Sequence, residues 1–445
     1  MTATTKESAL PSVHETGANS TSAGSASIED ARVAQPGADQ ADGQDTAARR
    51  WLAWMGSRLR RTGRAIADYG TYWLSSLLSK RKSLWIFGGA NGERFCDNSR
   101  HFFQWMQHMH PEIQSVWLTT NPAVLAKLRE QGVPCCHAYS KEGYRLALRA
   151  RVAVMSHSRM RDLNRFAVAG KTFVVQLWHG SPIQRRGLDV AGGAPRSLAG
   201  RVGRLRESLA CLLFPPRRER FDLLTAASAF TASHLATSFG VDPLKVVATG
   251  LARTDRLVLA KLDPRVPPRR IAYLPTQHGA AGSSWNPFDG LDVAEADRLF
   301  AKHDVEFLCK LHPENSLSEE TVAYLAGSKH MGLFECGDIH LHLDRFDLLV
   351  TDSSSVFVDF LVLGRPVAFF PRGCARPENL YFDYDWITPG PKAESWPELL
   401  EACVALLDDP TAWSDERAAV LQRFNAHEDG RNCKRIFEAI QMSLD

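Results

Sequence analysis

Short apolar runs rich in β-branched residues alternate with helix-patterned segments from Leu84 to the end of the chain. Such alternation is typical of strand–helix–strand units, which build parallel sheets with helices on both faces. Strands are predicted at 84–87, 115–118, 152–155, 173–177, 223–226 and 246–248, and then at 271–274, 306–310, 332–335, 347–350 and 366–370. We therefore expect an α/β protein.

A charged, proline-containing segment, residues 263–270, separates the two series and is predicted to be a linker. We expect two Rossmann-like, doubly wound domains, one over 83–262 and the other over 271–445. Two such domains of similar size leave a cleft lined by strand carboxyl ends. This is the GT-B arrangement of many nucleotide-dependent transferases.

The composition excludes several classes of protein. Hydrophobic residues make up 44% of the chain and charged residues 23%, which is ordinary for a soluble protein, and the net charge of +3 is too small to indicate a nucleic-acid partner. The nine cysteines are odd in number and irregularly spaced, which favours reduced thiols of a cytoplasmic protein over a disulfide framework. With no apolar run of about eighteen residues and no basic-then-apolar leader, we expect a chain that neither spans nor crosses a membrane.

The N-terminal region changes character at residue 49. Residues 1–48 contain no aromatic side chain and are predicted to be a disordered tail, because they cannot bury enough apolar surface. Residues 49–82 instead carry many arginines, together with apolar residues at helical spacing: Trp51, Met55, Leu59, Ile66, Tyr69, Trp73 and Leu77. This pattern predicts a basic amphipathic helix that lies peripherally on an anionic membrane surface, although a helix packed on its own domain would show a similar pattern.

A second basic stretch with apolar residues runs from Arg196 to Arg220. It indicates another membrane-contacting surface beside the acceptor opening, with a solvated helix and loop as the alternative.

His179 lies at the end of the strand predicted over 173–177, between Trp178 and Gly180. The carboxyl end of a parallel strand is the usual place for ligand chemistry in such sheets. We expect His179 to accept a proton near neutral pH, and Gly180 to leave room for a substrate. The alternative is a core histidine satisfied by the backbone.

A hydroxyl-rich turn follows the strand that ends at Val350. Thr351, Asp352, Ser353, Ser354 and Ser355 come between this strand and an apolar helix, which predicts a phosphate-binding turn. Lys310 and His312 end another strand of the same domain, so that together these groups can surround a diphosphate without a metal ion or cofactor.

Two weaker motifs are interpreted differently. Gly88, Gly89 and Gly92 predict a tight strand-to-helix turn rather than a dinucleotide site, because the full glycine pattern is missing. Asp383 and Asp385 resemble a metal-binding pair, but two acids at this spacing are common by chance, and we expect no metal.

Seven spaced motifs resemble, in order, those of the CDP-glycerol glycerophosphotransferase family, which includes teichoic-acid glycerol- and ribitol-phosphate primases and polymerases and capsule enzymes. The resemblance runs from about Leu84 to Ile436. The motifs are Trp178–Pro182 with Arg185–Gly187, Gly250–Asp255, Leu274–Thr276, Leu311–Pro313, Thr351–Ser355 with Asp359, Arg365–Pro366, and Tyr381–Tyr384. The resemblance implies a GT-B fold, a CDP-alditol donor such as CDP-glycerol or CDP-ribitol, and peripheral attachment to the cytoplasmic membrane face.

The resemblance also implies roles for single residues. By position, His179 is similar to the family's general base, and His312, Thr351, Ser354 and Ser355 are similar to its donor-phosphate ligands. Further cleft candidates fall within the same motifs: Arg253, Asp255, Thr276, Asp352 and Asp359. The chain departs from the family at Ser353, where tyrosine is frequent, and at Gln277-His278, where an aromatic–arginine pair is frequent.

Together these features predict a transferase of cell-envelope polymer biosynthesis, of the teichoic-acid or capsule type. The first domain would bind a lipid-linked glycan or polyol-phosphate acceptor, the second would bind the CDP-alditol, and transfer of the alditol phosphate would release CMP. One alternative is a GT-B glycosyltransferase that uses a nucleotide sugar. The other is a non-catalytic membrane scaffold of envelope polymer assembly.

Overall fold

The computed structural model describes residues 66–190, 219–261, 269–276, 286–311, 317–371 and 379–444, with Met55, Gly63, Arg206 and Leu209. Its contacts divide the chain into Met1–Thr62 and Gly63–Asp445, and the fold below is that of the second part. The predicted disordered tail, all but two residues of the predicted linker, and most of the basic stretch from Arg196 to Arg220 lie outside the described residues.

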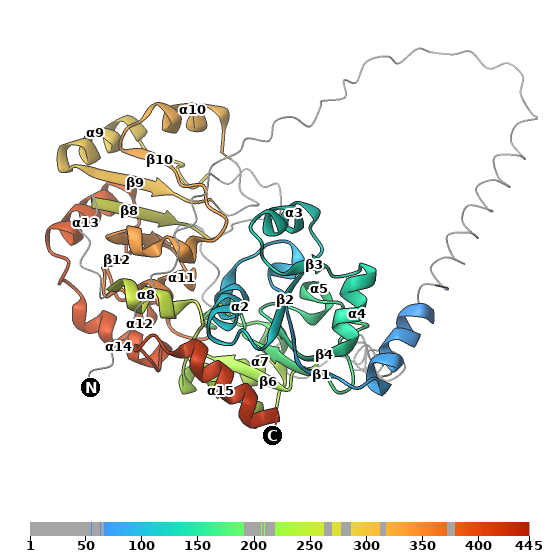
Figure 1. The fold of residues 1–445 in the computed structure, drawn as a ribbon. Helices are drawn as coiled ribbons and strands as arrows, with labels where there is room; N and C mark the ends of the chain where they lie inside the picture. Colours follow the sequence, from blue (N-terminus) through green and yellow to red (C-terminus); the bar gives the residue numbers. More distant parts are fainter. Residues whose placement is uncertain are drawn as a thin grey trace, which may run out of the picture. The chain divides into compact units, whose positions relative to one another are not determined.

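Seven parallel strands form the first sheet (Figure 1). Its spatial order is β3 (Cys135–His137), β2 (Gln114–Thr119), β1 (Arg81–Phe87), β4 (Ala150–Met155), β5 (Phe173–Gln176), β6 (Leu223–Ala226) and β7 (Val246–Ala248). Residues of β1 alternate between two cores: Leu84 and Ile86 belong to one, Trp85 and Phe87 to the other. Both faces of the sheet are therefore buried, as the near-continuous apolar character of its strands requires.

Several helices begin where the sequence supplies a capping side chain. The described helices of this part include α2 (Asp97–Met109), α3 (Pro122–Glu130), α4 (Lys141–Arg149), the short α5 (Arg159–Asp162), α7 (Ala229–Phe239) and α8 (Thr254–Lys261). Asn121 and Ser140 cap α3 and α4 through their side chains, and Ser228 forms a capping box with Thr231 at the start of α7. Such caps satisfy backbone amides that a helix start leaves without partners.

The second sheet has five parallel strands in the order β10 (Met331–Leu333), β9 (Val305–Cys309), β8 (Arg269–Leu274), β11 (Leu348–Thr351) and β12 (Val367–Phe369). Ala272 and Leu349 face one core, and Tyr273 and Val350 face the other. The accompanying helices are α9 (Val293–His303), α10 (Glu319–Gly327), α11 (Val356–Leu361), α12 (Tyr384–Ile387) and α13 (Trp396–Asp408).

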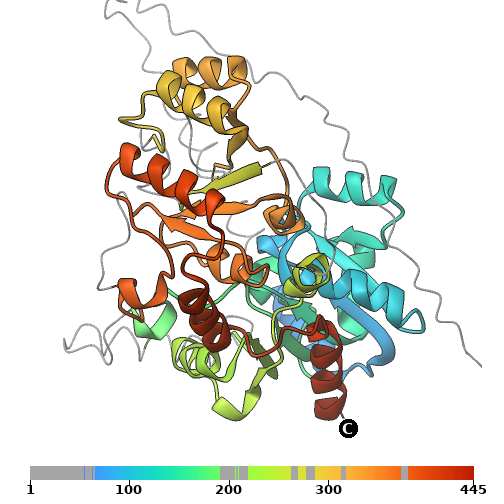
Figure 2. The same cartoon turned by 90° about the vertical axis from the view of Figure 1, so that its left-hand side faces the viewer.

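The last two helices return toward the first sheet. Helix α14 (Ser414–Phe424) contacts both α11 and α7, and α15 (Asn432–Leu444) buries Cys433, Ile436 and Ile440 in the core that contains Trp85. Figure 2 shows α15, in dark red, beside the blue and green elements of the first sheet. Residues 432–444 thus pack with the first sheet, although the sequence prediction placed them in the second domain.

Residues 66–77 are helical, and β1 begins at Arg81, so that Arg81 and Lys82 are strand rather than part of the predicted basic helix. Ser75 is buried and its hydroxyl donates to the carbonyl oxygen of Ala167 at 2.6 Å, which fixes this helix against the first domain. Among the described residues, no helix is both long and apolar enough to cross a membrane.

Candidate active site

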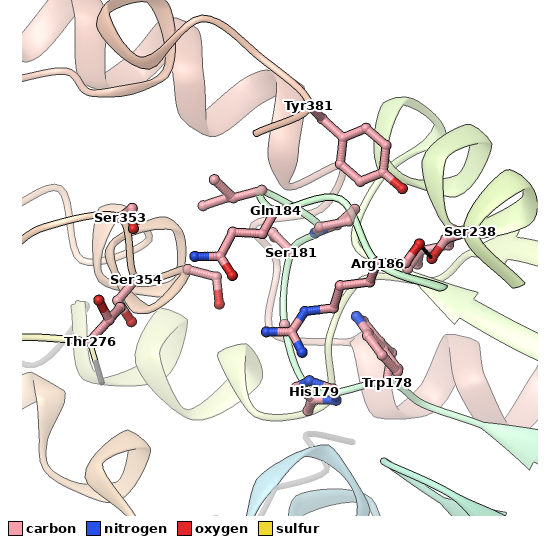
Figure 3. Close-up of a pocket in the computed structure, with 15 residues that line it drawn as sticks. Trp178, His179, Ser181, Gln184, Arg186, Ser238, Thr276, Ser353, Ser354 and Tyr381 are labelled. Carbon is pink, nitrogen blue, oxygen red and sulfur yellow. Dashed lines mark hydrogen bonds between the residues drawn. The ribbon is translucent and has the colours of Figure 1, made fainter. Parts of the chain in front are cut away.

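A pocket lies where loops from the carboxyl ends of the two sheets meet (Figure 3). Trp178 and His179 follow β5, and the turn 352–355 follows β11. Figure 3 shows Thr276, Ser353 and Ser354 on one side of the cavity and Trp178, His179 and Arg186 on the other. The full lining is Trp178, His179, Gly180, Ser181, Pro182, Ile183, Gln184, Arg186, Leu235, Ser238, Thr276, Ser353, Ser354, Ser355 and Tyr381.

The backbone that carries His179 is held from several sides. Trp178 has a left-handed φ of 55°, a conformation that costs a non-glycine residue about 1–2 kcal/mol. The side chain of Gln176 accepts the Trp178 amide at 3.0 Å, and the Asn98 side chain donates to the Trp178 carbonyl at 2.8 Å. Arg253 donates to the His179 carbonyl at 2.9 Å. These contacts offset the strain and fix where the imidazole points.

The imidazole of His179 has one nitrogen engaged. Its Nδ1 lies 3.3 Å from the carbonyl oxygen of Ser156, so the neutral ring holds its proton on Nδ1 and leaves Nε2 to accept another. The ring stacks on that of His157, with centroids 4.4 Å apart and planes 10° from parallel. The side chain is therefore placed for proton acceptance through Nε2.

Burial, followed by the charge of His157, lowers the pKa of His179 to about 3. This pKa is lower than the near-neutral value predicted from the sequence, because the ring is enclosed and stacked on a second imidazole. The Asp97 carboxylate acts in the opposite direction on the pKa. In the free protein His179 is thus neutral throughout the physiological range, and its lowered pKa makes it a weaker base than an ordinary histidine.

Sequence reasoning missed His157, whose position depends on the glycine-rich turn. The Ala90 amide donates to Nδ1 of His157 at 3.2 Å, within the turn that contains Gly88, Gly89 and Gly92. A Cβ on Gly88 would lie 2.2 Å from the carbonyl oxygen of Asp162, so the turn needs glycine to come this close. The signal in the sequence was the turn itself, interpreted as a strand-to-helix connection and not as a support for an imidazole.

The turn after β11 is organised by Asp352. One carboxylate oxygen of Asp352 accepts the amides of Ser353 and Ser354, at 2.6 and 3.2 Å, and the other accepts both the amide and the hydroxyl of Thr276. The amides of Ser353 and Ser354 are therefore occupied. The hydroxyls of Ser354 and Ser355 face the pocket and make no hydrogen bond to another described residue. These two hydroxyls are free to bind an anion.

Gly180 brings the two sides of the pocket together. It has a φ of 151°, and a Cβ at this position would lie 2.8 Å from the Ser355 hydroxyl and 3.1 Å from Nη2 of Arg253. A side chain here would be strained by this φ and would displace the Ser355 hydroxyl.

Comparison with known proteins identifies the family. The model of the family described as CDP-glycerol:poly(glycerophosphate) glycerophosphotransferase matches residues 71–442. The chain belongs to this family. It is 24% identical to a teichoic acid glycerol-phosphate transferase of Staphylococcus aureus (strain NCTC 8325 / PS 47) over 405 residues, which cover 86% of this chain and 99% of the relative.

Another relative is the teichoic acid poly(glycerol phosphate) polymerase of Bacillus subtilis (strain 168), 23% identical over 81% of this chain and 49% of the polymerase. Among solved structures, the wall teichoic acid polymerase TagF, in a histidine variant soaked with CDPG, superposes with a TM-score of 0.68 at 19% identity, covering 88% of this chain and 98% of that one. The glycerophosphotransferase described here has this two-domain GT-B fold.

Other predicted site residues of the glycerophosphotransferase lie beneath the pocket. Arg253 is buried and donates to Asp97 at 2.8 Å and to Asp359 at 2.6 Å. Asp97 belongs to the first domain and Asp359 to α11 of the second. Burial lowers the pKa of Arg253, but the charges of Asp359 and Asp97 outweigh burial and raise it. Arg253 and Asp359 thus join the two domains under the His179 loop rather than lining the pocket.

Three further candidates have structural contacts elsewhere. The Thr351 hydroxyl is buried and donates to the Leu274 carbonyl at 2.6 Å. The Asp255 carboxylate accepts the amides of Asn432 and Cys433, both at 2.8 Å, and so caps α15. Lys310 follows β9 and its ammonium group donates to the Leu311 carbonyl at 3.4 Å, away from the pocket lining. His312 lies outside the described residues.

The acidic pair at 383 and 385 has ordinary roles. The Asp383 side chain accepts the amides of Asp385 and Trp386 at the start of α12, and Asp385 forms an exposed ion pair with Lys392. Among the described residues, no cluster of three or more histidines, cysteines or acids forms a metal-ligand set.

Proposed function

We propose that this chain transfers glycerol phosphate, or another alditol phosphate, from a CDP-alditol to a hydroxyl of a membrane-linked glycan or polyol-phosphate acceptor, in synthesis of a teichoic-acid-like or capsular polymer. The observation that carries the proposal is the shared pocket, where Nε2 of His179 and the hydroxyls of Ser354 and Ser355 converge from different domains. Family membership supports the donor class.

The proposed step is an in-line displacement at phosphorus. The acceptor hydroxyl attacks the β-phosphorus of the donor, its proton passes to Nε2 of His179, and the bond from that phosphorus to the bridging oxygen breaks. CMP leaves with the electron pair, and the alditol phosphate remains on the acceptor. The serine hydroxyls donate hydrogen bonds to phosphate oxygens, an arrangement typically worth a few kcal/mol for each well-placed donor.

The decisive experiment incubates the enzyme with a lipid-linked acceptor and either CDP-glycerol or CDP-ribitol, and follows CMP release together with the product mass. Transfer of one or more alditol-phosphate units supports the proposal. Sugar transfer from a nucleotide sugar, with none from any CDP-alditol, would indicate a glycosyltransferase, and lipid binding without CMP release would indicate a scaffold.

His179→Ala separates binding from chemistry. Without its base the enzyme should lose about 10²- to 10⁴-fold in turnover while CDP still binds. His303→Gln, at the end of α9, is the matched control and should keep full turnover. Near-normal turnover of His179→Ala would remove the base assignment.

We further propose that the enzyme acts peripherally at the cytoplasmic membrane face, where a nucleotide-activated donor and a lipid-linked acceptor can meet. Support comes from the helix over 66–77, which leaves Ile66, Trp73 and Leu77 at 68%, 52% and 80% exposure. The preceding sequence supplies Arg58, Arg60, Arg61 and Arg64, and each basic residue near an anionic surface adds about 1 kcal/mol.

Co-sedimentation with vesicles tests the membrane proposal. Trp73→Ser combined with Leu77→Ser should reduce binding to vesicles that contain anionic phospholipid, because the apolar contact is lost. Leu244→Ser removes a leucine that is 89% exposed in the 3-10 helix Pro243–Lys245, outside the basic helix, and should leave vesicle binding unchanged. Equal binding by the double variant and the unmodified enzyme would overturn this proposal.

A further inference from the structure

The described lining of the pocket contains positively charged residue types and no acidic ones. The lining includes no aspartate or glutamate, and only His179 and Arg186 are of a type that carries positive charge. His179 is neutral, because its pKa is lowered to about 3. Among the described lining residues, Arg186 is therefore the single permanent cation. A pocket of this kind favours an anionic ligand.

The backbone of Arg186 is fixed while its side chain is available. Its carbonyl oxygen accepts the Ser238 hydroxyl at 2.9 Å and the Asp189 amide at 3.1 Å, and the preceding Arg185 amide donates to the Asn379 carbonyl at 2.7 Å. The Arg186 side chain makes no hydrogen bond or ion pair with another described residue. Figure 3 shows its guanidinium reaching into the cavity near His179.

The side chains of two neighbouring arginines, unlike that of Arg186, form hydrogen bonds or ion pairs within the protein. Arg253 is buried in ion pairs with Asp97 and Asp359, and Nε of Arg185 donates to the Leu380 carbonyl at 3.0 Å. Arg186 is exposed and no described residue holds its side chain, so its guanidinium is free to bind a ligand that enters the pocket. Its planar fork matches two oxygens of one phosphate group.

We propose that Arg186 binds the phosphoryl group in transfer and stabilises the negative charge that builds on its oxygens, opposite the hydroxyls of Ser354 and Ser355. This inference rests on the proposed function, and it identifies the side chain that stabilises the charge of the transferred phosphoryl group. In phosphoryl transfer the equatorial oxygens carry much of the developing charge, and a positioned guanidinium acts on that charge directly. His179 lies on the same side of the pocket, and its only role is then to accept the proton of the acceptor hydroxyl.

The test compares Arg186→Gln and Arg186→Lys with Arg298→Gln, a change on the exposed part of α9. Arg186→Gln should lower kcat with CDP-glycerol about 100-fold or more, with KM for the donor changed by less than about fivefold, because the contact strengthens in the transition state. Arg186→Lys should keep part of the rate, and Arg298→Gln all of it.

Chemical rescue distinguishes a guanidinium in contact with phosphate from one that supports the fold. Millimolar guanidinium ion should restore part of the turnover of Arg186→Ala and have no such effect on His179→Ala. Failure of rescue, or a kcat for Arg186→Gln within threefold of the unmodified enzyme, would overturn the inference while leaving the proposed function intact.

A second arm separates donor phosphate from acceptor phosphate. With an uncharged hydroxyl acceptor, or with water in slow hydrolysis of CDP-glycerol, the Arg186→Gln defect should persist. A defect seen only with phosphate-bearing acceptors would assign Arg186 to the acceptor and overturn the inference. An unmodified enzyme that releases no CMP from any CDP-alditol would instead overturn the proposed function, and the inference with it.

Discussion

At the scale of single residues, the enclosure of His179 sets how the activity should depend on pH. Its folded pKa is about 3, against an ordinary value of 6.5, so the base form persists down to acidic pH in the free enzyme. The kcat/KM profile reports the free enzyme. We expect no loss of kcat/KM from His179 protonation between pH 8 and 5. Initial-rate measurements that show an acidic limb near pH 6.5 would contradict this environment for His179.

The contact between Gly180 and the serine turn leads to a second residue-scale prediction. Gly180→Ala places a methyl group 2.8 Å from the Ser355 hydroxyl at a φ of 151°, so we expect destabilisation of about 1–3 kcal/mol together with a large fall in kcat. Gly337→Ala is the control, because a Cβ at Gly337 meets no atom within 4 Å. Thermal unfolding and CMP release measure the two effects, and a fully active Gly180→Ala would show that the approach is unnecessary.

At the scale of elements, strand prediction succeeded where buried β-branched runs were long enough to recognise. Strand β6 was predicted with its observed bounds, Leu223–Ala226, and β1 and β4 within a few residues. Strand β3, Cys135–His137, was missed because its sequence, Cys-Cys-His, contains no β-branched residue, whereas the equally short edge strand β7, Val246–Ala248, was predicted with its observed bounds. The return of α15 to the first sheet depends on long-range packing of Cys433, Ile436 and Ile440, which no local pattern encodes.

The same reasoning explains which site residues could be found. His179 follows a strand of the first sheet, and Thr276 and the serine turn follow strands of the second. Two such domains face a cleft lined by strand carboxyl ends, so these residues were predicted to lie together. Arg253 and Asp359 were recognised as candidates, but their shared burial beneath the loop is a tertiary contact. His157 was missed, because the stacking of one imidazole on another across β4 and β5 leaves no periodic signal.

An ion pair joins Asp359 of α11 to Arg253, the residue before α8, and leads to a prediction at the scale of elements. Asp359→Asn removes a fully buried carboxylate 2.6 Å from Arg253, and breaking one partner of a buried pair costs about 3–5 kcal/mol. Urea unfolding should show this loss. The control is Asp408→Asn in the exposed pair with Arg269, which should cost about 1 kcal/mol or less. Equal losses in the two variants would contradict the role of Asp359 as an interdomain anchor.

At the scale of the whole molecule, several kinds of contact join the two domains around the pocket. Gln184 and Leu380 form an antiparallel bridge, and the Tyr381 amide donates to the Ile183 carbonyl at 2.9 Å. Below them, the Asp97 amide donates to Asp338 at 3.1 Å, and His340 bridges Asp338 and Asp359. His179 and the serine turn are thus positioned by a shared interface, and the chain crosses it again before α15.

His340 makes this interface sensitive to pH. Burial and the charge of Arg253 lower its pKa, but hydrogen bonds to Asp338 and Asp359 outweigh them and raise the pKa to about 8, above the ordinary 6.5. The groups that face it are Asp338, Asp359, Arg253 and His101. Because the folded pKa is raised, the protonated ring contributes stability that is complete below about pH 6.5 and is lost as pH rises through 8.

The expected size of this contribution is about 2 kcal/mol, from a difference of roughly 1.5 pKa units at 1.36 kcal/mol each. Urea unfolding at pH 6 and pH 8.5 should therefore show a loss of stability with rising pH in the unmodified protein that His340→Gln lacks, while His303→Gln keeps it. Other groups titrate in both proteins, so the difference between the two slopes isolates His340. Identical slopes would mean that the His340 ring does not hold a proton between the two carboxylates, and that Arg253 alone balances Asp359 across the interface.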